Sequence, residues 1–201
     1  MNNKTVLSIA VLLAFATGFV SSQMLIWIEG SHNIICGNNT EIMVINDEDY
    51  YPVVIEKIEG AHSSIDIVMY EMKWYGEPEK ETHEVSKLAL SLVKAHKRGV
   101  RVRIILEDGK TYGYVSRSIE NYTKNWSMYF RSKGIEVRLD GGEQSTHDKL
   151  LIIDGKIVIL GSTNWSMSAL KYNHEANVMI ESKEVAEEYE EYFEELWSQS
   201  S

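Results

Sequence analysis

Residues 147–164 read H-D-K-L-L-I-I-D-G-K-I-V-I-L-G-S-T-N, and the rest of the chain is organised around this stretch. Two apolar runs, Leu150–Ile153 and Ile157–Leu160, lie on either side of an Asp154-Gly155 pair. An Asp-Gly pair between two β-prone runs is typical of a hairpin with a two-residue turn. The stretch therefore predicts two antiparallel strands joined by a tight turn.

A two-residue turn also fixes which residues face one another across the hairpin. Counting outward from the turn sets Lys149 opposite Leu160 and His147 opposite Ser162. Because cross-strand partners share one face and side chains alternate along a strand, His147, Lys149 and Ser162 are expected on one face. Asn164 continues the same alternation. An imidazole, an ammonium, a hydroxyl and an amide at one point can hold a phosphate group and attack it.

The spacing of these residues resembles the signature of a known family. H-x-K-x4-D followed by six residues and then G-S-x-N is similar to the motif of the phospholipase D superfamily, whose fixed positions fall on His147, Lys149, Asp154, Gly161, Ser162 and Asn164. Glu175, in N-H-E-A-N, resembles the glutamate that orients the catalytic histidine in the short endonucleases of this superfamily. Six fixed positions with correct gaps in a hairpin argue against a chance match.

The resemblance implies a mechanism and a partner. Members of this superfamily use two facing motifs and this chain has one, so the resemblance implies a homodimer with a shared site. His147 of one subunit is expected to attack phosphorus and form a phosphohistidine, while the second His147 protonates the leaving oxygen. Lys149, Ser162 and Asn164 are expected to bind phosphate oxygens, and Glu175 to fix the tautomer of the histidine. Neither a metal nor a cofactor is expected.

Asp154 has two interpretations. The resemblance implies a catalytic role for it. However, alternation along the strand places it away from Lys149, and an aspartate before a glycine is what the turn itself favours. Both roles stay open on the sequence alone.

Strand and helix patterns alternate along residues 40–201. The expected strands are Glu41–Ile45, Ser64–Tyr70, Val100–Leu106, Ile135–Leu139, the two hairpin runs and Ala176–Ile180. The expected helices are Tyr50–Gly60, Val85–Arg98, Ile119–Ser132 and Glu184–Trp197. This alternation predicts one α/β catalytic domain in which a mixed β-sheet is sandwiched between helices, the phospholipase D-like fold that the resemblance implies.

An apolar segment, residues 1–29, precedes this domain. Residues 5–28 carry no charge, and as a helix they would span about 36 Å, enough to cross a bilayer core of roughly 30 Å. A transmembrane anchor and a cleaved signal peptide, which would leave a secreted protein, both fit; the apolar run past Ser22 that ends at Trp27 favours the anchor. Residues 30–39 are expected to form a polar linker. Lys4, before the segment, predicts a catalytic domain outside the cytoplasm.

Composition restricts the function classes. The single cysteine excludes an internal disulfide framework and a cysteine-based zinc site. The net charge of −10 disfavours tight non-specific binding of nucleic acid, but its distribution is uneven. Residues 100–174 carry eleven basic and eight acidic side chains, whereas residues 175–201 carry one and nine. The basic segment supplies five candidate phosphate contacts: Lys110, Lys124, Arg131, Lys133 and Arg138.

The substrate is the open question. Compact size and the basic segment favour an endonuclease that cleaves DNA or RNA. A phospholipase D-type hydrolase of membrane phospholipids such as cardiolipin is the alternative, supported by the apolar segment and by Trp74, Tyr75 and Trp165. A non-catalytic membrane scaffold is disfavoured because the motif is intact. The endonuclease is the favoured interpretation, although the acidic loop over residues 71–84 would repel polyanions if it bordered the site.

Overall fold

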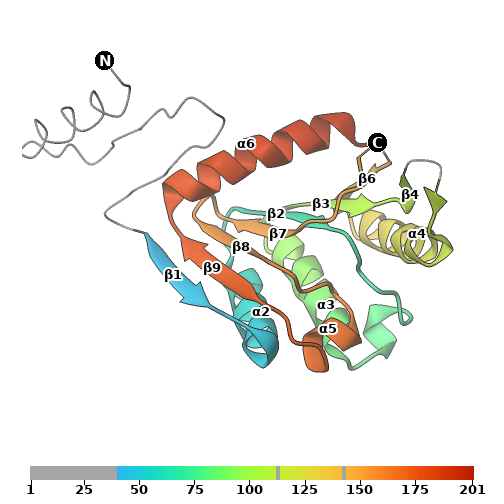
Figure 1. Cartoon of the computed structure of the whole chain (residues 1–201), viewed down its shortest axis with the longest axis horizontal. Coiled ribbons are helices and arrows are strands. Elements are labelled where there is room, and N and C mark those ends of the chain that lie inside the picture. The colour runs from blue at the N-terminus through green and yellow to red at the C-terminus, as the bar shows by residue number, and fades with distance from the viewer. Residues whose placement is uncertain (1–39, 112–113, 142–143) are drawn as a thin grey trace, which may run out of the picture. The chain divides into compact units, whose positions relative to one another are not determined.

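A seven-stranded mixed β-sheet forms the centre of the structure, a computed structural model that describes residues 40–111, 114–141 and 144–201 (Figure 1). The strand order is β1-β9-β8-β7-β2-β3-β6. The strands are β1 (Glu41–Val44), β2 (Ser64–Met69), β3 (Arg101–Glu107), β6 (Glu136–Asp140), β7 (Lys149–Ile153), β8 (Ile157–Gly161) and β9 (Asn177–Glu181). Neighbours among β2, β3 and β6 are parallel, and the other neighbouring pairs are antiparallel. The predicted mixed sheet is confirmed.

Helices cover both faces of this sheet, which confirms the predicted α/β sandwich (Figure 1). One face carries α2 (Tyr50–Gly60), α3 (Glu84–Lys97), α4 (Arg117–Ser132) and the short α5 (Met167–Lys171), and the other carries α6 (Lys183–Gln199). The connections contain the 3-10 helices η1 (Asp47–Asp49) and η2 (Pro78–Lys80) and a small hairpin of β4 (Lys110–Thr111) and β5 (Tyr114–Val115). Neither α5 nor this small hairpin was predicted from the sequence.

Alternation along β7 explains its unbroken apolar run. Leu151 and Ile153 belong to the core on the α2–α3 side, whereas Leu150 and Ile152 pack against α6. All four side chains are at most 3% exposed. A strand covered on both faces needs apolar residues at successive positions, and residues 150–153 of β7 meet that requirement.

The predicted two-residue hairpin turn is wrong by one residue. Ile153 pairs with Ile157, so three residues form the loop. The Asp154-Gly155 pair has positive φ angles of 56° and 59°, as a tight turn requires. Lys156 is the third residue of the loop. Its N–H donates to the Ile153 carbonyl (3.1 Å), and its own carbonyl accepts the N–H of Ser182 (2.9 Å). The bond to Ser182, which directly follows β9, keeps Lys156 out of the β7–β8 pairing.

This shift changes which side chains share a face. Leu160 pairs with Leu150, not with Lys149, and the same register also excludes the predicted pairing of His147 with Ser162. Simple alternation across the hairpin therefore does not place His147, Lys149 and Ser162 on one face.

The predicted anchor or signal peptide, residues 1–29, and the predicted linker, residues 30–39, lie outside the described residues. Within the part of the chain that the structure describes, no helix combines the length and the apolar character needed to cross a membrane.

Candidate active site

His147 and Lys149 are in contact at the start of β7. The Lys149 ammonium lies 3.2 Å from Nδ1 of His147 and donates a hydrogen bond to the His147 carbonyl (2.6 Å). The centroid of the Tyr70 ring lies 4.3 Å from that of the His147 ring and 4.9 Å from Nζ of Lys149. The pairing of β2 with β7 brings Tyr70 here, because its N–H donates to the Asp148 carbonyl (2.9 Å). Tyr70 was not singled out in the sequence.

Lys149 is a strongly buried cation, only 7% exposed. Burial lowers the pKa of its ammonium below the ordinary lysine value, and the negative charges of Asp148, Glu175 and Glu71 offset only part of that shift. Burial acts in this direction because the charged form loses its hydration. A phosphate oxygen beside Nζ would give the charge a direct partner, so Lys149 is placed to bind an anion.

A buried carboxylate holds the loop that leads into His147. Glu107, 2% exposed at the end of β3, accepts hydrogen bonds from the Thr146 N–H (2.8 Å) and the Ser145 hydroxyl (2.9 Å). The Thr146 hydroxyl in turn bonds the Asp140 carboxylate at the end of β6. Glu107 was not predicted as a site residue. Its one signal in the sequence is its position, directly after the apolar run of a strand.

The loop after β8 is fixed to β9 through Gly161 and Asn177. A Cβ atom on Gly161 would lie 2.7 Å from Cα of Asn177, so only glycine allows this close approach. The Asn177 side chain accepts the N–H of Thr163 (3.2 Å) and donates to the Thr163 hydroxyl (2.9 Å). These bonds set the positions of Ser162 and Asn164 on either side of Thr163. Asn177 was also missed, although it ends the N-H-E-A-N segment.

Glu175 lies beside Ser162 just before β9. The Ser162 hydroxyl donates to the Glu175 carboxylate, and Nδ2 of Asn173 donates to its other oxygen (3.0 Å). The backbone N–H of Glu175 donates to the Asp47 carboxylate (2.6 Å), which ties this segment to η1. Within the described residues, the hydrogen bonds of the Glu175 carboxylate go to Ser162 and Asn173, and the predicted bond to the His147 ring is not formed.

Asn164 has a side-chain oxygen that is buried without a hydrogen-bond partner among the described residues. The next residue, Trp165, is fully buried, with its N–H donating to the Glu71 carbonyl (3.0 Å) and its indole N–H to the Tyr50 hydroxyl (3.2 Å). Trp165 therefore anchors this end of the loop in the core. The acidic loop runs alongside the motif, since Met72 forms a β-bridge with Trp165.

Asp154 lies at the other end of β7, about 17 Å from Lys149 at the usual rise per strand residue. Its carboxylate accepts the backbone N–H groups of His62, Ser63 and Ser64 and the hydroxyl of Ser63, at 2.7–3.2 Å. Burial would raise the pKa of Asp154, but these N–H groups lower it below its ordinary value. The contacts support a structural role for Asp154, which ties the hairpin turn to the segment before β2.

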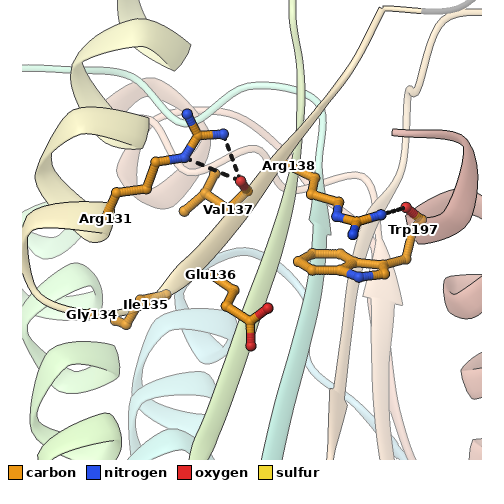
Figure 2. A pocket seen from close by; sticks show the side chains of 7 residues that line it. All are labelled: Arg131, Gly134, Ile135, Glu136, Val137, Arg138 and Trp197. Carbon is orange, nitrogen blue, oxygen red and sulfur yellow. Dashed lines mark hydrogen bonds between the residues drawn. The ribbon is translucent and has the colours of Figure 1, made fainter. Parts of the chain in front are cut away.

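Four of the five candidate phosphate contacts have partners inside the protein. Lys110 pairs with Glu120 (3.1 Å) and Lys133 with Glu79 (2.8 Å). Figure 2 shows the guanidinium of Arg131 on the Val137 carbonyl and that of Arg138 on the Trp197 carbonyl, on the wall of a hollow of about 310 Å³. Arg138 also lies over the indole of Trp197, 4.5 Å from its centroid. Arg131 thus joins α4 to β6 and Arg138 joins β6 to α6, whereas the ion pairs of Lys110 and Lys133 are partly exposed.

The described residues thus bring together an imidazole, a buried ammonium and an aromatic ring, with a hydroxyl, a carboxylate and an amide on the neighbouring loop. The imidazole can act as a nucleophile or an acid, and the ammonium can hold a phosphate oxygen. No three His, Cys, Asp or Glu side chains in the described ranges gather closely enough to hold a metal ion.

Comparison with known proteins shows a family match over most of the chain. The model described as "Cardiolipin synthase, PLD-like domain" matches residues 54–197. The mitochondrial cardiolipin hydrolase of Xenopus tropicalis is 30% identical over 118 residues, which are 59% of this chain and 52% of that protein. The phospholipase D of Rickettsia prowazekii is 32% identical over 136 residues, 68% of this chain and 57% of that protein. The chain thus spans about half the length of these relatives.

Solved structures of the same fold match a larger share of this chain than those two relatives do. The phospholipase D family member Nuc from Salmonella typhimurium superposes with a TM-score of 0.65 at 25% identity, over 81% of this chain and 97% of that one. NucT from Helicobacter pylori superposes with a TM-score of 0.61 at 22% identity, over 81% and 98%, a likeness that concerns the fold alone.

Proposed function

This chain belongs to the phospholipase D superfamily, and from that premise we propose that it is a metal-independent phosphodiesterase acting through His147. The observation that supports this best is the buried Lys149 ammonium 3.2 Å from the His147 ring, at the open end of the sheet. An ammonium in that place can hold the phosphate whose phosphorus the imidazole attacks, and it supplies charge that a metal ion supplies in other phosphodiesterases.

The proposed reaction has two steps. Nε2 of His147 attacks phosphorus, the N–P bond forms, and the P–O bond to the leaving alcohol breaks as that oxygen takes a proton from a second histidine. Water then gives a proton to the second histidine and attacks phosphorus, which releases His147. The attacking ring needs its own proton on Nδ1. We assign to Glu175 the role of accepting a hydrogen bond from this Nδ1–H group. It would do so once a bound phosphate attracts the Lys149 ammonium away from Nδ1.

The second histidine would be His147 of the partner subunit, since the chain carries one copy of the motif. A homodimer with its twofold axis at the site would also bring a second Lys149 to the phosphate. Activity per subunit should then fall on dilution in step with dissociation of the dimer, measured by sedimentation equilibrium and initial rates at matched concentrations. A monomer with full activity would exclude the shared site.

Phospholipid is the substrate class that these observations favour. Arg131 and Arg138 are bound to backbone carbonyls, Lys110 and Lys133 have carboxylate partners, and the carboxylates of Glu71, Asp148 and Glu175 act on Lys149. A second phosphate next to the scissile one would be repelled by these carboxylates, and nucleic acid always brings one. An endonuclease is the second candidate, supported by the resemblance of the motif to the short endonucleases. If the substrate is a phospholipid, the predicted anchor over residues 1–29 would bring the enzyme to the membrane that contains it.

The test uses the full chain in detergent micelles with excess EDTA. Bis(p-nitrophenyl) phosphate, phospholipid in mixed micelles, and single- and double-stranded DNA serve as substrates. His147→Ala should lower kcat at least about 10³-fold on every cleaved substrate, as the loss of a catalytic nucleophile does. His62→Ala, which changes an exposed imidazole outside the site, is the matched control. Substantial turnover by His147→Ala, or turnover abolished by EDTA, would refute the mechanism. Cleavage of DNA but not of lipid would select the second candidate.

A further inference from the structure

An apolar strip lies on the α6 face of the sheet, at the edge that β1 forms (Figure 1). Ile42 and Val44 on β1 are 63% and 64% exposed. Ile42 pairs with Ile180 and Val44 with Val178, and Val178 also pairs with Leu160 on β8. Ile180 and Leu160 pack against the core under α6. Because cross-strand partners share one face of a sheet, all five side chains lie on that face, and we call them the β1 strip.

The β1 strip is apolar at each of its positions, whereas the opposite face of the same strands carries charge. Glu41 pairs with Glu181 there, and Lys156 forms an ion pair with Glu181 (2.5 Å). Among the described residues, β1 pairs with β9 on one side and has no strand on the other. Edge strands of soluble proteins are commonly protected by charges or prolines, and β1 has neither on its α6 face. A contiguous exposed apolar surface of this kind marks contact with a protein or a membrane.

The chain before β1 points to a membrane as the partner. Residues 5–28 carry no charge, and the sequence predicts that they cross a bilayer. Residues 29–40 separate that segment from Glu41, and a chain of that length reaches at most about 43 Å when fully extended. An anchor over residues 1–29 would therefore hold β1 within that distance of a lipid surface at all times.

Three properties of this region restrict the partner further. α6, beside the strip, carries seven glutamates and one lysine, so an anionic lipid surface would be repelled. The exposed parts of Ile42 and Val44 fall far short of the roughly 800 Å² that each partner buries in a standard protein interface. The unpaired backbone groups at the outer edge of β1 must stay hydrated, which limits the contact to the headgroup level of a bilayer.

We propose that the β1 strip docks on the headgroup region of a zwitterionic lipid bilayer. Ile42 and Val44 enter between the headgroups, while the glutamates of α6 remain in water. Leu160, at the inner end of the strip, directly precedes Gly161 of the loop that carries Ser162. Docking therefore turns the site end of β8 towards the lipid. The proposal concerns binding alone and does not depend on the proposed phosphodiesterase function.

The experiment measures the depth of β1 in phosphatidylcholine vesicles that carry the full chain. In a Cys36→Ser background, Val44→Cys is labelled with an environment-sensitive fluorophore. Met128→Cys, on α4 on the other face of the sheet and 65% exposed, is the matched control. A nitroxide near the glycerol end of the acyl chains should quench the label at Val44 at least about twofold more strongly than the label at Met128. Iodide in the water should show the opposite order.

A second variant shows whether the strip itself makes the contact. Ile42→Asp, added to the chain labelled at Val44, should remove at least about half of the quenching by the nitroxide, because a carboxylate on the strip must stay in water. Quenching that this change leaves intact would overturn the proposal, as would equal quenching of both labels by iodide. Protection of the Val44 label from both quenchers would overturn it in favour of a second protein copy on β1. A chain that does not float with the vesicles in a density gradient would exclude both the docking and the predicted anchor.

Discussion

Replacement of Asp154 tests whether this residue serves the chemistry or the turn. Its carboxylate receives four donors from residues 62–64. At about 0.5–1 kcal/mol net for each bond in this half-buried setting, they contribute about 2–4 kcal/mol. Alanine would also pay about 1 kcal/mol for the left-handed backbone at φ 56°. We therefore expect Asp154→Ala to lower the free energy of unfolding by about 3–5 kcal/mol.

Asp154→Asn provides a graded comparison. Asparagine tolerates the left-handed conformation and keeps one acceptor oxygen, so we expect a loss of about 1–2 kcal/mol. The difference in the free energy of unfolding between the wild type and this variant should also disappear in acid. The pKa of Asp154 is lowered in the folded state, so its stabilisation is complete above the unfolded value of about 3.9 and disappears as the pH falls through the folded value. Urea unfolding at pH 7 and at lower pH measures both effects.

The kinetic result separates the two roles. Because Asp154 lies about 17 Å from Lys149, kcat of the folded variants on bis(p-nitrophenyl) phosphate should stay within about threefold of the wild type. Lys156→Ala, an exposed change in the same loop that breaks only the surface pair with Glu181, is the control and should cost less than about 1 kcal/mol. A hundredfold loss of kcat in Asp154→Asn with unchanged unfolding would refute the structural interpretation.

Three further predictions concern the loops around the site. Gly161→Ala should destabilise the protein by about 1–3 kcal/mol in urea unfolding, because its Cβ would overlap Asn177, and unchanged stability would contradict this packing. Glu107→Gln removes the charge that accepts the Thr146 N–H and should lower kcat about tenfold with little change in KM; a pure KM effect would argue against a role in holding the loop. The pKa of Lys149 is lowered by burial, so kcat/KM should fall in alkali below the ordinary lysine pKa of about 10.4, and Lys149→Arg, if active, should lack that fall.

Elements defined by local pattern were predictable from the sequence. The helix Tyr50–Gly60 was predicted to the residue, and the two hairpin runs each differ from β7 and β8 by one residue at one end. Apolar runs and helical periodicity specify such elements because each must bury its face against a neighbour. The motif likewise identified His147 and Lys149 before any contact was known, and the structure places them 3.2 Å apart.

Features set by contacts distant in sequence were not predictable. The extra loop residue Lys156 depends on a bond to Ser182, and the position of His147 depends on a bond from Thr146 to Glu107. In both cases the partner lies on another strand or loop, and nothing in the local pattern names it. α5, five residues long, was missed because so short a helix shows little periodicity.

Local charge counts likewise did not predict which cations are available to a substrate, because their partners lie elsewhere in the sequence. The excess of basic residues in 100–174 predicted a surface for polyanions. Arg103, however, is only 8% exposed and lies between Asp66 and Glu194 on α6, and Lys110 and Lys133 form ion pairs nearer the surface. At the site itself, the Lys149 ammonium interacts electrostatically with three carboxylates. A phosphate bound by one such lysine would be attracted by a single charge and repelled by several. The number of basic residues in a segment therefore does not predict whether the segment binds a polyanion.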